Sequence, residues 1–373
     1  MYIWRWTLIF SPTLSPQQHK TTMPKILVTG GCGYIGSHTI VDLIEHGFEV
    51  VSVDNFCNAD ASVLDGMEAI TGRRVFNYAT DLCDLPATRL IFEEHPDIAG
   101  VIHFAALKAV GESVEQPLRY FHNNLNSLLH ILTCMRDFGV RHLIFSSSCS
   151  VYGNAAELPV TETTPWQEAE SPYGRSKQMG EQIIRDALPA CPGMNSILLR
   201  YFNPAGAHPS ALIGESPSNP ASNLVPVITE TAMGLRREMT VFGADYPTRD
   251  GSCVRDYIHV MDLANAHTKA LQYLLEQRNE SPCEVFNLGV GQGVTVLEAL
   301  AAFERVSGVQ PAYSIGPRRP GDVVAVYADN ARAVERLGWQ PGYRIDDIMR
   351  SAWDWEQRRS EERRVGKECR SRW

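Results

Sequence analysis

Features that direct a chain toward several classes of protein are missing from this sequence. No apolar run approaches the roughly 20 residues that a membrane-spanning helix needs. Lys and Arg (34) do not outnumber Asp and Glu (43), and the net charge of −9 gives no sign of a nucleic-acid-binding surface. The nine cysteines stand singly, without a C-x-x-C pair, which argues against a disulfide framework or a metal site. We therefore expect a globular protein of a reducing compartment, the cytoplasm, with neither a membrane nor a nucleic acid as partner.

The two ends lack the periodic patterns of the rest of the chain. Residues 1–22 contain no acidic residue, and their apolar patch, Trp6 to Phe10, is shorter than the apolar core of a signal peptide. The residues from Ser360 onward carry five Lys or Arg against three Glu and show no apolar periodicity. We predict a disordered extension over 1–22 and a disordered tail over 358–373.

A glycine-rich turn lies between the first strand-like run and the first amphipathic helix. Residues 25–29 are apolar enough for a strand buried on both faces, and Gly30, Gly33 and Gly36 follow directly. Glycines there let the backbone turn tightly and approach a pyrophosphate at the N-terminus of the helix. Asp54, at the end of the next strand, is placed to accept hydrogen bonds from a ribose. Since its carboxylate repels a 2′-phosphate and no Arg follows closely, the predicted cofactor is NAD.

Strand and helix patterns continue to alternate through the first half of the chain. Further strands are predicted at 49–53, 75–78, 101–104, 142–145 and 195–201. This order predicts an α/β fold, a Rossmann-type doubly wound parallel sheet with a smaller mixed α/β C-terminal lobe. We expect an NAD-binding domain over 23–203, to which the chain returns later, and a lobe over 204–357 that mainly binds substrate. The residues expected to share one crevice, because each lies at a strand end, are Gly30, Asp54, Asp81, Phe104 and Ser148.

Tyr173 and Lys177 form the most reactive pairing in the sequence. Pro172 can open a helix, and a helix from Tyr173 places both side chains on one face, one turn apart. We expect the ammonium group to lower the tyrosine pKa, so that the phenol can take a proton from an alcohol and return it. Ser148 is predicted to share a hydrogen bond with that alcohol. A Tyr and a Lys at this spacing, taken alone, are more often an ordinary surface pair. The predicted sheet next to them is what favours a catalytic role.

The second half of the chain is expected to bind an anionic substrate. Regular alternation fails after the strand at 195–201, and residues 207–222 have the Pro, Ser, Gly and Asn content of a loop. Arg255 and Arg319 are the cations that we expect at a diphosphate, because one guanidinium group can donate hydrogen bonds to two phosphate oxygens at once.

Three longer stretches carry a resemblance to a known family. Residues 103–113, residues 200–204 with 206–210, and residues 254–262 resemble UDP-glucose 4-epimerases. The glycine turn and the Ser148, Tyr173 and Lys177 set are similar to the wider superfamily of extended short-chain dehydrogenases/reductases. The resemblance covers roughly residues 24–357. It implies a homodimer formed by the helices at 118–138 and 178–187.

The resemblance implies a set of binding residues. The residues implied to contact NAD, besides the three glycines, are Tyr34, Ile35, Asp54, Asn55, Asn58, Asp81, Leu82, Phe104, Ala105, Ala106, Lys108, Asn123, Tyr173, Lys177 and Phe202. The residues implied to hold the UDP-sugar are Ser148, Tyr173, Asn203, Asn223, Leu224, Phe242, Arg255, Arg319 and Asp322.

The resemblance also implies a reaction. Tyr173 takes the proton of the sugar 4-hydroxyl while a hydride leaves C4 for the nicotinamide of NAD. The resulting 4-keto sugar turns over, and the hydride returns to its other face, so UDP-galactose and UDP-glucose interconvert. Lys177 is implied to keep the phenol pKa low, and NAD is implied to remain bound throughout.

Other functions remain open from the sequence. Another sugar-nucleotide enzyme is one, but Cys149 and Ser150 stand where the related dehydratases tend to carry acidic residues. A UDP-N-acetylglucosamine 4-epimerase is a second, since Val326 replaces a residue, often tyrosine, that walls the sugar pocket in the family. A non-catalytic NAD-binding sensor is a third, and it would have no need for Ser148, Tyr173 and Lys177.

Overall fold

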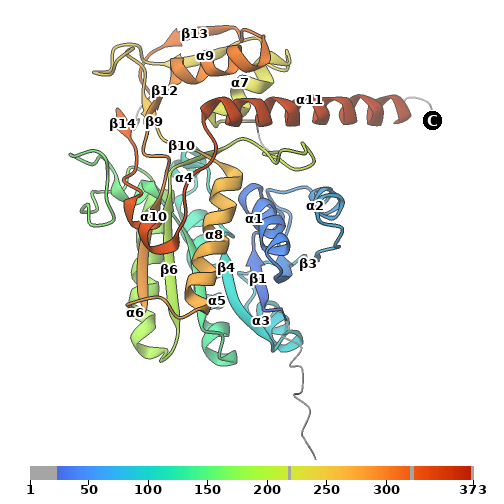
Figure 1. Ribbon diagram of the computed structural model, residues 1–373, viewed down its shortest axis with the longest axis vertical. Coiled ribbons are helices and arrows are strands. Elements are labelled where there is room, and N and C mark those ends of the chain that lie inside the picture. Colours follow the sequence, from blue (N-terminus) through green and yellow to red (C-terminus); the bar gives the residue numbers. More distant parts are fainter. Residues whose placement is uncertain (1–22, 217–219, 320–322, 371–373) are drawn as a thin grey trace, which may run out of the picture.

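A seven-stranded sheet forms the centre of the larger domain (Figure 1). The computed structural model describes residues 23–216, 220–319 and 323–370. The strands lie in the order β11-β6-β5-β4-β1-β2-β3, and every neighbouring pair is parallel. They are β1 (Lys25–Thr29), β2 (Glu49–Val53), β3 (Phe76–Tyr78), β4 (Ile98–His103), β5 (His142–Ser148), β6 (Asn195–Tyr201) and β11 (Cys283–Leu288). The predicted parallel sheet is confirmed.

Helices cover both faces of this sheet (Figure 1). They are α1 (Tyr34–Glu45), α2 (Val63–Thr71), α3 (Leu85–Glu94), α5 (Pro117–Phe138), α6 (Pro172–Ala187), α8 (Val260–Leu275) and α10 (Ala331–Leu337), and the short α4 (Val110–Glu115) packs on α5 and α6. Alternate residues of β1 face opposite layers: Ile26 and Val28 pack with residues of α1 and α8, and Leu27 packs with residues of α3, α5 and α6. Burial on both faces explains why the strands read as continuous apolar runs.

A smaller lobe lies above one end of the sheet (Figure 1). The helices of this lobe are α7 (Leu224–Ala232), α9 (Val296–Ser307) and α11 (Ile345–Arg370). Its short strands are β7 (Asn203–Ala205), β8 (Met239–Phe242), β9 (Val254–Arg255), β10 (Tyr257–His259), β12 (Val294–Thr295), β13 (Tyr313–Gly316) and β14 (Ala325–Val326). β7 follows directly on β6 and pairs with β10, which leads back into α8. The lobe is therefore attached at the carboxyl end of β6, beside the predicted crevice.

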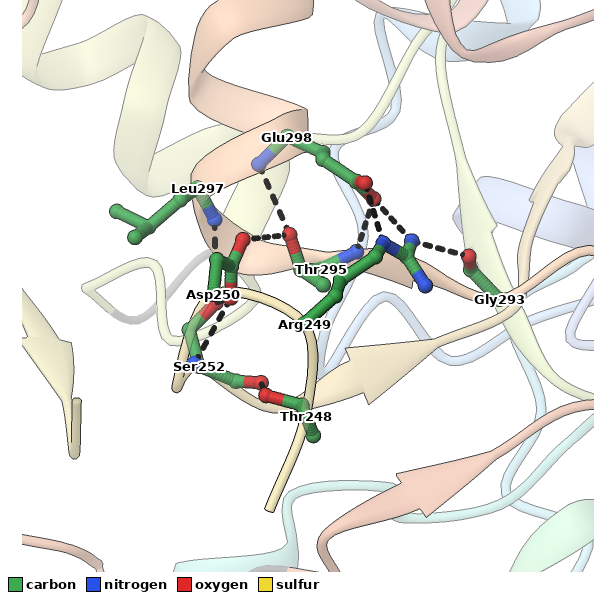
Figure 2. Close-up of polar contacts among 8 residues, drawn as sticks. All are labelled: Thr248, Arg249, Asp250, Ser252, Gly293, Thr295, Leu297 and Glu298. Atoms are coloured by element: carbon green, nitrogen blue, oxygen red, sulfur yellow. Dashed lines mark hydrogen bonds and ion pairs between the residues drawn. The ribbon is translucent and has the colours of Figure 1, made fainter. Parts of the chain in front are cut away.

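A polar network fixes the start of α9 in this lobe (Figure 2). Thr295 and Glu298 form a reciprocal capping box, in which each side chain accepts a backbone N–H of the other residue. Asp250 accepts hydrogen bonds from Thr295 and Ser252, and Arg249 pairs with Glu298. The loop at 248–252 is thus held against α9 by side chains rather than by a strand ladder.

Two aspartates in the stretch 254–262 have structural roles. Asp256 is fully buried, and its carboxylate accepts the N–H groups of Val290 (2.8 Å), Gly291 (3.1 Å) and Ala328 (3.1 Å). The Asp262 carboxylate accepts two further N–H groups from residues 342 and 343. Buried carboxylates are retained here because backbone donors replace their water.

The prediction of a disordered tail over 358–373 is wrong for residues 358–370, because α11 continues to Arg370, and residues 371–373 lie outside the described residues. Glu, Lys and Arg are abundant there, and all three favour helix even where no apolar face exists. The Arg359–Glu356 ion pair (3.3 Å) supports one turn of it. The extension predicted at 1–22 lies outside the described residues. Within the described chain, no helix is both long and apolar enough to cross a bilayer.

Candidate active site

The glycine turn after β1 is built for close backbone contacts. Gly30 has φ +67°, and a Cβ there would lie 2.9 Å from the backbone nitrogen of Ala105. A Cβ on Gly36 would lie 2.2 Å from the Gly30 carbonyl oxygen. Gly33 directly precedes α1, so the N-terminus of that helix opens at the turn. The close packing of this turn fits the approach of a pyrophosphate group, as in a dinucleotide.

Asp54 braces the same turn. Its carboxylate accepts the N–H of Cys32 (3.1 Å) and the N–H of Phe56 (2.9 Å), so it joins the end of β2 to the glycine turn. Burial raises the pKa of Asp54, against these backbone hydrogen bonds, which lower it. The carboxylate keeps further lone pairs with which it can accept ribose hydroxyls.

The other residues predicted for the cofactor follow the carboxyl ends of neighbouring strands. Asn55 and Asn58 follow β2 at exposed positions. Exposed Asp81 and buried Leu82 come after β3, and Phe104, Ala105, Ala106 and Lys108 come after β4. Asn123 lies on α5, and buried Phe202 follows β6. The side chain of Ile35 packs against the core instead, which leaves its backbone for a ligand. Parallel strands bring these segments to one edge of the sheet.

Ser148, Tyr173 and Lys177 meet at the end of β5. Ser148 is the last residue of the strand, and Ser171 caps α6 by accepting the Gly174 N–H (3.2 Å). Lys177 is 5% exposed, and its Nζ lies 5.9 Å from the centre of the Tyr173 ring. The Tyr173 side chain is half-buried, and the nearby Ser148 hydroxyl lowers the pKa of its phenol. The three predicted catalytic residues are therefore brought together.

The prediction that the pKa of Tyr173 falls is wrong when only the protein's own groups act on the phenol. Burial raises the pKa of Tyr173 strongly, and the hydrogen bond from Ser148 opposes this only in part. The Lys177 ammonium donates to the Ser146 carbonyl oxygen (2.6 Å). Burial lowers the pKa of Lys177 to about 8, against the charge of Glu181, which raises it. Desolvation thus disfavours the charged form of both members of the pair.

The sequence analysis missed a buried ion pair beneath these residues. Glu181 is one helical turn beyond Lys177, and Arg200 binds its carboxylate with two hydrogen bonds (2.8 and 2.6 Å). Ser147 donates to the same carboxylate at 2.5 Å, which fixes the residue before Ser148. Glu181 is fully buried and Arg200 is 2% exposed. A charged residue inside the apolar run 196–200 was the signal, since a buried guanidinium requires a partner.

The predicted substrate residues gather around the lobe. Phe242 is exposed at the end of β8, and the Arg319 guanidinium lies 4.7 Å from its ring centre. Arg255 lies on β9 and donates to the carbonyl oxygens of Val254 (2.9 Å) and Val323 (2.6 Å). Asn203 starts β7, and among the described residues its buried Oδ1 has no hydrogen-bond partner. Such an atom fits a polar ligand group. Asp322 lies outside the described residues.

A second missed residue, Glu215, connects the predicted cofactor and substrate residues. Its Oε1 accepts Nδ2 of Asn223 at 2.8 Å and lies 3.5 Å from Nζ of Lys108. Asn223 directly precedes α7, where Leu224 is the first residue. Glu215 lies in a loop region without periodicity, so no pattern in the sequence indicates this long-range contact.

Comparison with known proteins decides the family. The family described as GDP-mannose 4,6 dehydratase matches residues 27–352. The UDP-glucose 4-epimerase of Yersinia pestis is 48% identical over 331 residues, which cover 89% of this chain and 97% of that protein. The chain belongs to the UDP-glucose 4-epimerase family. The resemblance read from the motifs is confirmed, and with it an isomerase class.

Solved structures of UDP-glucose 4-epimerases share the fold. The enzyme from Stenotrophomonas maltophila, described with bound NAD and formylated UDP-arabinopyranose, is 46% identical with a TM-score of 0.88. That match covers 91% of this chain and 100% of that chain. The enzyme from Bifidobacterium longum, in complex with NAD+ and UDP, is 45% identical with a TM-score of 0.85, covering 90% and 98%. The Rossmann-type α/β class is confirmed.

Proposed function

We propose that this protein interconverts UDP-galactose and UDP-glucose by oxidising C4 of the hexose, turning the 4-keto sugar over and reducing it again. The observation that carries this proposal is the group of buried Ser148, half-buried Tyr173 and buried Lys177 at the end of β5. It lies in a parallel sheet whose first turn fits a dinucleotide, and its two solved relatives bind NAD and a uridine nucleotide.

Tyr173 exchanges one proton with the sugar in each half of the reaction. Tyr173 takes the proton as a phenolate in the first half and gives it back in the second, and because burial raises its pKa, the protein alone disfavours that phenolate. The Ser148 hydroxyl lies near enough to the phenol to lower its pKa, so it can pass the proton from the 4-hydroxyl. When bound, NAD supplies a hydride acceptor for C4 and a positively charged ring. Lys177, held by the Ser146 carbonyl, orients its ammonium beside the Tyr173 ring.

The uridine nucleotide is the part of the substrate that is held firmly. Phe242 and Arg319 offer a ring face and a cation, Arg255 offers a second guanidinium, and Asn203 offers an amide. The hexose must be held more loosely, because the 4-keto sugar has to present both faces to the same cofactor. Binding energy at the diphosphate therefore allows this rotation without loss of the intermediate.

The direct test uses the purified protein without added cofactor. Incubation with UDP-galactose should give UDP-glucose, because NAD is regenerated in every cycle and remains bound. Product should be identified by chromatography against both sugar nucleotides. Absence of UDP-glucose, both without cofactor and with added NAD, would show that the proposed reaction is wrong.

N-acetylated UDP-hexoses form a second candidate class of substrate. Val326 on β14 is buried and packs in one cluster with Val151, Tyr152 and Phe202, of which Phe202 is assigned to the cofactor. A valine there fills less volume than a tyrosine would. Turnover of UDP-N-acetylglucosamine is the test, and its absence beside efficient turnover of UDP-galactose would exclude this class.

A Val326→Tyr variant should separate the two substrates. We expect the added ring to reduce kcat/KM for UDP-N-acetylglucosamine about 10-fold or more, because a hydrophobic wall discriminates bulk by about 1–3 kcal/mol. The kcat/KM for UDP-galactose should change much less. Steady-state kinetics with both substrates measure this, and equal losses for both would indicate general overpacking of the cluster instead of a specificity wall.

A homodimer in the cytoplasm is the assembly that we propose. Five apolar side chains on α4, α5 and α6 are exposed, namely Val110, Val114, Leu118, Leu129 and Met179. α5 and α6 pack side by side, so two copies can bury these residues in a four-helix bundle.

Leu118→Glu is expected to dissociate this dimer. Leu118 is 81% exposed on α5. Because a two-fold interface contains each residue twice, the change would bury two carboxylates in the dimer. Light scattering after size exclusion should give a monomer mass. Leu90→Glu is the control, because Leu90 is also an exposed leucine, at 55%, but lies on α3. A dimer that survives the Leu118 change would place the interface elsewhere.

A further inference from the structure

A loop from the lobe lies across the nucleotide-binding domain. This loop, residues 206–215, contains an antiparallel bridge between Ala207 and Gly214, and the His208 N–H donates to the Ile213 carbonyl (3.1 Å). Ile213 is 1% exposed and belongs to the core cluster that includes residues of α1. A Cβ on Gly66 of α2 would lie 2.6 Å from the Leu212 carbonyl oxygen. The tip of the loop is therefore seated on the cofactor domain.

Both ends of the loop are fastened to residues assigned to the cofactor. At its start, the Gly206 carbonyl accepts the hydroxyl of Tyr34, the first residue of α1 (2.6 Å). At its end, the Glu215 carboxylate faces Lys108 across 3.5 Å. The Lys108 ammonium also lies 5.9 Å from the centre of the Tyr34 ring. Tyr34, Lys108 and the loop thus form one connected unit beside the glycine turn.

The lobe holds Glu215 in place from the other side. The Asn223 amide donates to the same carboxylate oxygen at 2.8 Å, and the Trp355 indole N–H donates to the Glu215 carbonyl at 3.0 Å. Gly214 packs on the Trp355 ring, where a Cβ would lie 2.5 Å from the indole. The Glu215 side chain is 10% exposed, whereas that of Lys108 is 58% exposed. The carboxylate is fixed by the fold, and the lysine is the partner that can move.

We propose that Glu215 is a positioning residue that keeps the loop 206–215 closed over bound NAD and so slows release of the cofactor. This inference rests on the proposed function, since Tyr34 and Lys108 are assigned to NAD through it. Under this proposal, NAD leaves the glycine turn after the contacts of Tyr34 and Lys108 with the loop have opened. A mostly buried carboxylate strengthens that closure because water screens its charge weakly.

The test compares cofactor release from three purified holoenzymes. Glu215→Gln keeps the size of the side chain and an acceptor for Asn223 but removes the charge facing Lys108. Glu215→Ala removes both contacts. Glu230→Gln is the matched control, because it deletes a glutamate charge of the same lobe that pairs with Arg236 (2.6 Å). Released NAD is captured by an excess of an NAD-dependent dehydrogenase with its alcohol substrate and followed by absorbance.

We expect release about five-fold faster for Glu215→Gln, a typical effect of one partly exposed ion pair. Release from Glu215→Ala should be faster still, and Glu230→Gln should match the unsubstituted protein. In a Lys108→Met background, the Glu215→Gln change should add little. If both Glu215→Gln and Glu215→Ala release NAD at the rate of the unsubstituted protein, the proposal is overturned. This holds whether or not the unfolding midpoint of the cofactor-free variant is lower. An unsubstituted protein that forms no UDP-glucose even with added NAD would instead contradict the proposed function.

Discussion

Replacing Tyr173 by Phe should lower the turnover of UDP-galactose by about 10²–10⁴-fold, the usual contribution of one general acid–base group. The change removes a single oxygen from a half-buried side chain next to Ser148, and it leaves the ring beside Lys177 in place. Bound NAD and affinity for UDP should therefore be retained. Initial rates, cofactor content after denaturation and UDP binding by calorimetry measure the three quantities.

Tyr273→Phe provides the control for loss of a buried tyrosine hydroxyl. Tyr273 is 2% exposed on α8, where its hydroxyl contacts Glu284 (3.1 Å) and Arg336 (2.9 Å) far from Ser148 in the sheet. Its variant should keep turnover close to that of the unsubstituted protein. Near-normal turnover of the Tyr173 variant would remove Tyr173 from proton transfer. Loss of bound NAD from that variant would point to a binding role instead.

The parts of the fold that were predictable are those encoded over short stretches. Residues 25–29, Gly30 and the helix after them form one local unit, because a doubly buried strand, a tight turn and a helix start each need particular residues nearby. The helix with Tyr173 and Lys177 was placed by Pro172 and a one-turn spacing, and α6 begins at that proline.

The parts that were not predictable depend on contacts between distant segments. Glu215 meets Lys108 across 107 positions of sequence, and no periodicity marks either residue as a partner of the other. Glu181 and Arg200 pair through the packing of α6 on β6. The wrong pKa direction for Tyr173 has the same origin. Spacing showed that a lysine was near, but only the folded structure shows how deeply both groups are buried and that Ser146 holds the ammonium.

Burial of the catalytic groups has a thermodynamic cost that the protein retains for function. Lys177 is charged at neutral pH in the unfolded chain, whereas burial lowers its pKa in the folded protein to about 8 from an ordinary 10.5. A depressed lysine pKa means that the unfolded chain binds the proton more tightly. The charge therefore destabilises the fold fully below pH 8, and the penalty fades as pH rises from about 8 toward about 10.5.

Lys177→Met should consequently stabilise the protein while it abolishes activity. The pKa difference corresponds to about 3 kcal/mol, and loss of the hydrogen bond to the Ser146 carbonyl offsets about 1 kcal/mol of it. We expect the free energy of unfolding of the cofactor-free protein to rise by about 2 kcal/mol at pH 7. At pH 9.5 the gain should have largely disappeared, because the unsubstituted protein no longer carries the buried charge. Turnover should fall at least about 100-fold at both pH values.

Urea unfolding at the two pH values measures the stability, and Lys269→Met is the control. The Lys269 ammonium also donates to a backbone carbonyl, that of Gly338 at 2.7 Å, but from an exposed position, so its removal should neither stabilise the fold nor lower turnover. A stabilisation by Lys177→Met that is the same at pH 7 and 9.5 would show that improved packing, not removal of a buried charge, is responsible. A loss of stability at pH 7 would mean that the hydrogen bond of the ammonium to Ser146 stabilises the fold by more than desolvation of the charge destabilises it. The hypothesis that this lysine lowers stability for the sake of catalysis would then be wrong.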